Sequence, residues 1–307
     1  MAAVATPPAV GTGAVRARLD QRRWHFQHGP IDLVVEAFGD GAAGAIERGW
    51  RRFETVLEEL VAELPTLRRP VQGAGTLAGP VAQRMRAACW PYRERFITPM
   101  AAVAGAVADE VLAAMGNAVP KAYVNNGGDI ALHLAPGERL RVGVIADSDR
   151  ALRHGHRLPL DGAFEIEASF PVRGVATSGW RGRSWSLGIA DSVTVLAATG
   201  AAADAAATMI ANAVDVTSPA IERRPACDVD DNTDLGERLV TVGVGALPDE
   251  ALATALGNGV ALAEALGAAG LIWGAVLSLQ GRYRVAGGAR AAERALVRCI
   301  FPRNNDH

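Results

Sequence analysis

The segment Asn125–Asp129, which reads Asn-Asn-Gly-Gly-Asp, restricts the fold of this chain more than any other stretch. It lies between two short runs typical of β-strands, Lys121–Val124 and Ile130–Leu134. Two consecutive glycines give the backbone access to dihedral angles that other residues avoid, so the chain can turn within a few residues. The segment therefore predicts a strand, a tight turn and a second strand.

The rest of the chain mixes the two periodicities. Apolar residues recur at helical spacing over Ala45–Leu64, and Pro65 is expected to end that helix. Over Phe164–Phe170 every second residue is apolar, which is typical of a half-buried strand. Strands and helices follow one another without strict βαβ alternation, which predicts an α+β fold with mixed or antiparallel sheets packed against helices. The predicted helices are 45–64, 81–89, 101–115, 201–214, 249–266 and 290–297, and the predicted strands are 22–27, 31–38, 121–124, 130–134, 140–144, 164–170, 192–198, 238–244 and 271–279.

Length and composition suggest one domain. The chain has 307 residues, of which 50% are hydrophobic, enough for a large core. We expect a flexible arm at residues 1–20, a single domain over 21–303 and a short tail at 304–307. Within the domain, residues 218–234 form a polar, acidic connector.

Charge and cysteine content exclude several classes of protein. The formal net charge of −2 argues against a nucleic-acid partner. The three cysteines, Cys89, Cys227 and Cys299, lie far apart, so we expect reduced thiols rather than a disulfide framework or a metal knuckle. The N-terminal residues do not resemble a signal peptide and no apolar stretch has the length and composition of a membrane span, so a cytoplasmic location is expected.

Three short segments could form a binding site. In the first, Gly127 and Gly128 would let a ligand approach the backbone, and Asp129 could accept hydrogen bonds or face a cation; the alternative is a turn capped by Asn and Asp. In the second, Gly174–Gly179, backbone N–H groups and the hydroxyls of Thr177 and Ser178 could bind phosphate, although such a segment is usually only a loop.

The third segment combines a carboxylate with a hydroxyl. Asp204 and Thr208 are four residues apart in an Ala-rich helix, so both oxygens lie on one face. This pair suits a hard cation such as Mg²⁺, with phosphate oxygens or waters as further ligands. The alternative is a solvated Asp and a Thr that hydrogen-bonds to its own helix.

The acidic connector carries one further pattern. Asp228, Asp230, Asn232 and Asp234 alternate as at the start of a calcium loop. The position that requires glycine holds Thr233, and the twelfth position is not glutamate, so an EF-hand is excluded.

Taken in order, these segments resemble the ApbE superfamily, the FAD:protein FMN transferases. The resemblance covers residues 95–215, and the whole chain looks closest to an uncharacterised soluble branch of the superfamily. The matching segments are Gly105 and Asp109 for a GxxxD helix, Val124–Ile130 for a VNxGGDI turn, Ala176–Gly179 for an ATSG segment, Ser192–Val195 for an SVTV strand, and Ala201–Thr208 for an ADAxxT helix.

The resemblance implies a cleft that binds FAD, with Mg²⁺ neutralising the pyrophosphate. Asp204 and Thr208 would be the metal ligands, completed by a backbone carbonyl near Val103. A flavin or another small nucleotide is therefore the expected partner, and a homo-oligomer is compatible with the apolar composition. The implied cofactor-binding residues are Asn126, Gly127, Gly128, Asp129, Thr177 and Ser178.

Two departures from the family pattern bear on the reaction. The first is Ala104, which stands where the family has a lysine. The second is the stretch Trp180–Asp191: it contains no histidine, whereas the family has a histidine between its ATSG and SVTV segments. Asp191 is the remaining candidate for a base, and FMN transfer to a protein threonine is not expected. Three hypotheses stay open: an Mg²⁺-dependent enzyme acting on a flavin or another pyrophosphate nucleotide, a non-catalytic nucleotide-binding protein, and an oligomeric scaffold with a vestigial site.

Overall fold

The turn at Gly127 and Gly128 joins two strands, as the sequence predicts. In the computed structural model, which describes residues 13–73, 75–144, 162–182 and 184–287, β4 (Lys121–Asn126) pairs antiparallel with β5 (Asp129–Leu134). The two glycines have φ angles of 64° and 118°, in the region that favours glycine. The backbone N–H of Gly128 donates to Oδ1 of Asn125 at 2.8 Å, which closes the turn.

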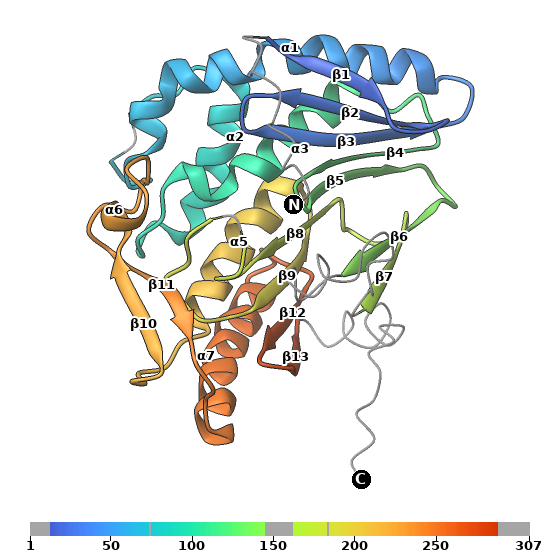
Figure 1. The fold of residues 1–307 in the computed structure, drawn as a ribbon. Helices are drawn as coiled ribbons and strands as arrows, with labels where there is room; N and C mark the ends of the chain where they lie inside the picture. Colours follow the sequence, from blue (N-terminus) through green and yellow to red (C-terminus); the bar gives the residue numbers. More distant parts are fainter. Residues whose placement is uncertain (1–12, 74, 145–161, 183, 288–307) are drawn as a thin grey trace, which may run out of the picture.

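The hairpin lies in the middle of a nine-stranded sheet (Figure 1). Each neighbouring pair in this sheet is antiparallel, so the α+β prediction is confirmed, with antiparallel pairing throughout the described sheet. In spatial order, the strands that flank the β4–β5 hairpin are β1 (Val15–Arg18), β2 (Arg23–His28) and β3 (Ile31–Phe38) on one side, and β8 (Gly174–Ser178), β9 (Ser192–Ala197), β12 (Gly274–Leu279) and β13 (Arg282–Ala286) on the other.

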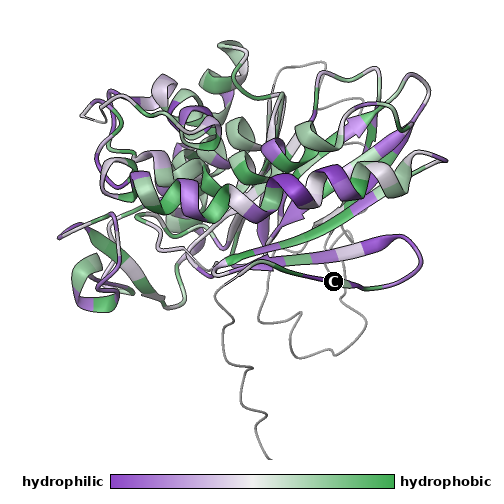
Figure 2. Cartoon of the chain, turned by 90° about the horizontal axis from the view of Figure 1, so that it is seen from above, coloured by the Kyte–Doolittle hydropathy of each residue, from purple (hydrophilic) through white to green (hydrophobic). Residues whose placement is uncertain are grey.

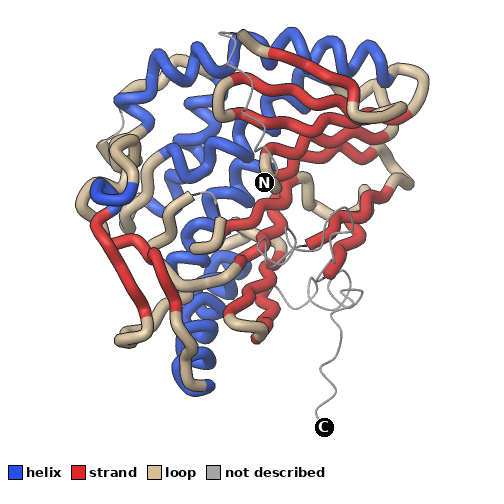
Figure 3. Tube along the Cα trace, in the orientation of Figure 1, coloured by secondary structure: helices blue, strands red, loops and turns tan. Residues whose placement is uncertain are grey.

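Helices cover one face of the sheet, and a small hairpin covers part of the other (Figures 1 and 3). The hairpin consists of β6 (Arg139–Val144) and β7 (Gly162–Glu167), and Val142 and Ile166 bury their side chains in a small core on that face. All six residues of β9 are buried, as expected for a strand covered on both faces. The helices are α1 (Ala42–Leu67), α2 (Pro80–Cys89), α3 (Val103–Met115), α5 (Gly200–Ala213) and α7 (Asp249–Ala268), with short 3₁₀ turns η1 (Trp90–Tyr92) and η2 (Pro99–Ala102).

The helical segments follow from apolar spacing. In α1, Ile46, Trp50, Phe53 and Val56 recur on one face and are buried, while charged residues occupy the opposite face. The same mixture of hydrophilic and hydrophobic residues along the helices is visible in Figure 2. Helix α1 therefore packs its apolar face against α3 and β3. The long segment that contains α1, α2 and α3 connects β3 to β4, its neighbour in the sheet.

Four expectations need correction. Val15–Arg18 forms a strand paired with β2, rather than part of a loose arm. Pro65 does not end α1, because the helix continues to Leu67. The small-residue segment 174–178 is a strand in the sheet rather than a loop. The connector 218–234 contains two elements, β10 (Ile221–Pro225) and α6 (Ala226–Val229), and β10 pairs with β11 (Leu239–Val244). The helix expected at 290–297 lies outside the described residues.

Helix α7 is long and apolar enough to cross a membrane by length and composition alone. One third of its most apolar window is buried, and the helix packs against α5, β12 and β13. Leu252, Leu256 and Leu266 are among the residues that it contributes to the main core.

Candidate functional site

Most residues predicted for the site line one cavity of about 330 Å³. The cavity lies between η2 and α3, the β4–β5 turn, the end of β8 and one face of α5. The sheet brings the two glycine-containing segments together because β5 and β8 are neighbouring strands. The predicted residues that line the cavity are Asn126, Gly127, Asp129, Thr177, Ser178, Asp204 and Thr208.

A close contact between α3 and α5 sets the geometry of the cavity floor. A Cβ atom on Gly105 would lie 2.2 Å from the carbonyl oxygen of Gly200, so only glycine permits this approach. Asp109 follows Gly105 by four positions on α3. Its carboxylate accepts hydrogen bonds from the backbone N–H groups of Gly200 and Ala201 at 2.8 and 2.9 Å. These N–H groups belong to the first turn of α5, which has no intrahelical acceptors for them. The two residues that match the GxxxD pattern therefore fix the helix that carries Asp204.

Asp204 projects from α5 towards the beginning of α3. Its Oδ2 atom accepts a hydrogen bond from the backbone N–H of Gly105 at 3.0 Å. Burial raises the pKa of Asp204 well above its usual range, and the nearby negative charge of Asp129 raises it further. Asp204 is half-buried, lines the cavity and is hydrogen-bonded to α3, in contrast to the freely solvated aspartate of the alternative interpretation. The hydrogen bond from Gly105 partly stabilises the ionised carboxylate, and a cation in the cavity would stabilise it further.

The β4–β5 turn and β8 are joined by side-chain hydrogen bonds at the cavity wall. Asp129 Oδ1 accepts from the backbone N–H of Thr177 at 3.1 Å, and the Thr177 hydroxyl lies 2.9 Å from that of Thr194 on β9. Asn126 donates from Nδ2 to the carbonyl oxygen of Ala104 at 3.2 Å, which ties the turn to α3. These contacts hold Asp129 and Asn126 at the edge of the cavity.

Two predicted residues lie elsewhere. Gly128 is not among the residues that line the cavity, and its role is in the turn. Asp191 also lies outside the lining: its Oδ1 accepts from Nε1 of Trp180 at 3.2 Å and from Nε of Arg181 at 3.0 Å, and its Oδ2 accepts from the backbone N–H of Gln280. This carboxylate anchors the loop after β8, and its placement gives the proposed base role no support.

The cavity also contains residues that motif reasoning missed. Residues 230–235, which follow α6, contribute Asp230, Asn232, Thr233, Asp234 and Leu235 to the wall opposite α5. The alternating acidic pattern was the signal available in the sequence, but a calcium loop was the only binding role it suggested. The apolar part of the wall includes Phe96, Ile97, Met100, Trp185, Leu187 and Met209, which no short motif marks. Val103, near which the resemblance implies a carbonyl ligand, also lines the cavity.

The described part of the lining carries acidic charges. Four aspartates, at positions 129, 204, 230 and 234, line it, whereas no Lys, Arg or His occurs among the described residues of the lining. Within the described part of the chain there is no group of three or more His, Cys, Asp or Glu side chains that could hold a metal ion by themselves. A cation held by Asp204 and Thr208 would therefore need further oxygen ligands from the backbone, water or a bound molecule. This is the usual pattern for Mg²⁺, which is bound through one or two carboxylates together with substrate phosphates.

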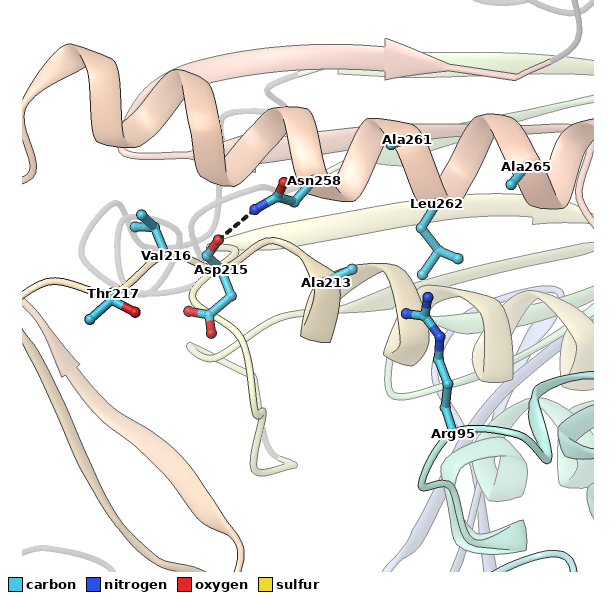
Figure 4. Close-up of a pocket in the computed structure, with 9 residues that line it drawn as sticks. All are labelled: Arg95, Ala213, Asp215, Val216, Thr217, Asn258, Ala261, Leu262 and Ala265. Carbon is cyan, nitrogen blue, oxygen red and sulfur yellow. Dashed lines mark hydrogen bonds between the residues drawn. The ribbon is translucent and has the colours of Figure 1, made fainter.

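A second hollow, of about 790 Å³, lies between α7, the end of α5 and the loop that carries Arg95 (Figure 4). Asn258 donates from Nδ2 to the carbonyl oxygen of Asp215 at 3.0 Å across its rim. The Asp215 carboxylate is bound by the guanidinium of Arg223, and none of the residues predicted from the motifs lines this hollow. It is therefore not the candidate site.

The antiparallel sheet thus brings the segments that carry the sequence resemblance around one cavity. The family model described as AbpE bacteria matches residues 16–285, and the chain belongs to this family, which confirms the resemblance found in the sequence. A UPF0280 protein of Methanopyrus kandleri is 34% identical over 221 residues, which cover 69% of this chain and 83% of that protein. A UPF0280 protein of Methanospirillum hungatei is 33% identical over 190 residues, 60% of this chain and 69% of that protein.

Among solved structures, the apo form of the Pseudomonas stutzeri flavinyl transferase ApbE is 13% identical, and the match covers 91% of this chain and 95% of that one. The TM-score of this match is 0.38. The name UPF0280 assigns no activity to the archaeal relatives.

Proposed function

We propose that the protein binds a flavin or another pyrophosphate-containing nucleotide as its Mg²⁺ complex and acts on it as an Mg²⁺-dependent enzyme. The main support for this proposal is that Asp204 and Thr208 line the same cavity as the β4–β5 turn and the end of β8. Small residues such as Gly127 leave room for phosphate oxygens near the backbone.

The electrostatics of the cavity support a metal-bound ligand. A pyrophosphate is an anion, and the described lining contributes carboxylates without any Lys, Arg or His. A free nucleotide would therefore be repelled, whereas Mg²⁺ between its phosphates and Asp204 would offset both charges. When bound, the ion would polarise the phosphoryl groups and stabilise negative charge that develops on them.

The apolar wall supports a ligand with a planar ring. Phe96, Trp185, Leu187 and Met209 line the same cavity as the polar residues. Clefts that combine an apolar lining with a few polar groups are typical sites for small molecules and cofactors. A flavin or nucleobase would bury its ring against this wall and direct its phosphates towards Asp204.

A second candidate function is nucleotide binding without chemistry. It is favoured by the absence of Lys, His and Cys from the described part of the lining, and by Ala104, which stands in the cavity where the resemblance implies lysine. Asp191, the candidate base, has its carboxylate engaged by three donors. FMN transfer to a protein threonine is not part of either proposal.

Chromatographic analysis of FAD incubated with the purified protein and Mg²⁺ separates the two functions. Formation of FMN and AMP, lost in the Asp204→Asn variant, would support the enzyme. Mg²⁺-dependent retention of unchanged FAD would support the binding protein. FAD that neither binds nor reacts would exclude both functions for this nucleotide.

A further inference from the structure

Residues 230–235, here called the acidic turn, close one side of the cavity at the tip of the β10–β11 ribbon. Asp230, Thr233, Asp234 and Leu235 all contribute to the cavity wall. The turn is built from local hydrogen bonds: the backbone N–H of Thr233 donates to the carbonyl of Asp230 at 3.2 Å, and the N–H of Leu235 donates to the Thr233 hydroxyl at 3.1 Å. It can therefore keep its shape independently of the opposite wall.

The base of the ribbon is fixed to the body of the protein. Thr241 on β11 donates from its N–H to the carbonyl of Ser186 at 2.9 Å, and from its hydroxyl to the carbonyl of Gly188 at 2.8 Å. On β10, the Arg223 guanidinium donates to the carbonyl of Leu187 and to the Asp215 carboxylate. Thr241 is 1% exposed, so its two hydrogen bonds are shielded from water, and the Arg223 contacts are partly buried.

The tip is attached differently. The hydroxyl of Thr98, at the beginning of η2, donates to Oδ2 of Asp234, and the Arg238 guanidinium lies 3.2 Å from the centroid of the Phe96 ring. Among the described residues, no backbone hydrogen bond joins the acidic turn to residues 96–104. The tip is thus held across the cavity by side chains, while the base is held by backbone acceptors. Regions with few tertiary hydrogen bonds open locally at low free-energy cost.

We propose that the acidic turn is a lid over the cavity and that the Thr98–Asp234 hydrogen bond is its latch. The inference rests on the proposed function for the identity of the ligand, the Mg²⁺ complex of a pyrophosphate nucleotide. Asp234 acts as a positioning residue: its carboxylate holds the wall that carries Leu235 and Thr233 against η2. The lid opens for the ligand to enter and its closure slows release.

Hydrogen–deuterium exchange of the ligand-free protein tests the latch without any nucleotide. In Thr98→Val, which keeps the side-chain shape and removes the donor, amides 230–235 should exchange about tenfold faster, the effect of losing one charge-assisted hydrogen bond. Asp234→Ala should give the same increase. Thr98→Ser keeps the hydroxyl, and Asp231→Asn removes an exposed charge on the same turn that does not line the cavity, so both should match the wild type. Unchanged exchange in Thr98→Val and Asp234→Ala would overturn the latch.

Stopped-flow release of FAD, bound in the presence of Mg²⁺, tests the lid. Release should be about tenfold faster from Thr98→Val than from wild type and Thr98→Ser. Faster exchange combined with unchanged release would overturn the lid. FAD that fails to bind to wild-type protein would contradict the proposed function, while the exchange experiment would still decide the latch.

Discussion

The contact between α3 and α5 predicts that the same substitution, Gly to Ala, has opposite effects at two helical positions. At Gly105 the added Cβ would lie 2.2 Å from the carbonyl oxygen of Gly200 and 2.7 Å from the backbone nitrogen of Ala201. Both are backbone atoms, so the two helices must separate. At Gly257, exposed on α7, a Cβ has no neighbour within 4 Å.

The magnitudes follow from these distances. Relieving the clash at Gly105 needs a shift of roughly 1 Å, and overpacking of this kind costs about 1–3 kcal/mol. The shift also lengthens the hydrogen bonds from Gly200 and Ala201 to Asp109, worth about 1 kcal/mol in all. The better helix propensity of alanine offsets about 1 kcal/mol of this, so Gly105→Ala should lower the free energy of unfolding by about 1–3 kcal/mol. Gly257→Ala should raise it by about 0.5–1 kcal/mol.

Urea unfolding monitored by circular dichroism measures both variants against wild type. In Gly105→Ala, separation of the two helices also displaces the backbone N–H of residue 105, which donates a hydrogen bond to Asp204 in the wild type. Gly105→Ala should therefore also weaken binding of the nucleotide with Mg²⁺, whereas Gly257→Ala should leave it unchanged. Equal effects of the two substitutions on stability would refute the reasoning.

Three further predictions concern buried polar groups. Asp109→Ala should lower the free energy of unfolding by about 1–3 kcal/mol, because two buried N–H groups lose their acceptor; urea unfolding measures this, and Asp109→Asn should recover part of the loss. Since burial raises the pKa of Asp204, the folded state holds this proton more tightly than the unfolded state, and the resulting stability is lost as pH rises from about 4 through the folded pKa. In metal-free buffer, wild type should therefore lose stability relative to Asp204→Asn over that range, and parallel pH profiles from thermal unfolding would contradict this. Arg223→Ala should lower the free energy of unfolding by about 1–3 kcal/mol and accelerate exchange of the Leu187 segment, because the partly buried Leu187 carbonyl and the Asp215 carboxylate lose a charged donor; unchanged exchange there would count against the anchor.

The sequence predicts local elements better than their partners. Period-2 and helical spacing identify β5, α3 and α5 because each buries one face, and the Gly-Gly turn identifies the hairpin. Segment 174–178 carries small residues and one glycine, so nothing local marks it as a strand; it is one because β5 and β9 provide edges on both sides. Pro65 lies in the last turn of α1, where the packing of Leu67 in the core outweighs the local preference to end the helix.

The same distinction holds for the site. Asp204 and Thr208 could be paired from helical spacing, and the segments around Gly127 and Thr177 from their small residues. The contribution of Asp234 could not be predicted, because it depends on a contact with Thr98, 136 positions earlier in the chain. Asp191 illustrates the converse: its position after the small-residue segment suggested a base, but that position could not predict its hydrogen bonds to Trp180 and Arg181 or its place outside the cavity lining.

The measurement that tests the central claim most directly is isothermal titration calorimetry of FAD with and without Mg²⁺. Wild-type protein and Asp231→Asn should bind FAD with Mg²⁺ present and at least tenfold more weakly after chelation, because the carboxylates of the cavity oppose an unneutralised pyrophosphate. Asp204→Asn should lose this Mg²⁺ dependence. Binding of equal affinity with and without Mg²⁺, or a Mg²⁺ response that survives in Asp204→Asn, would contradict the account.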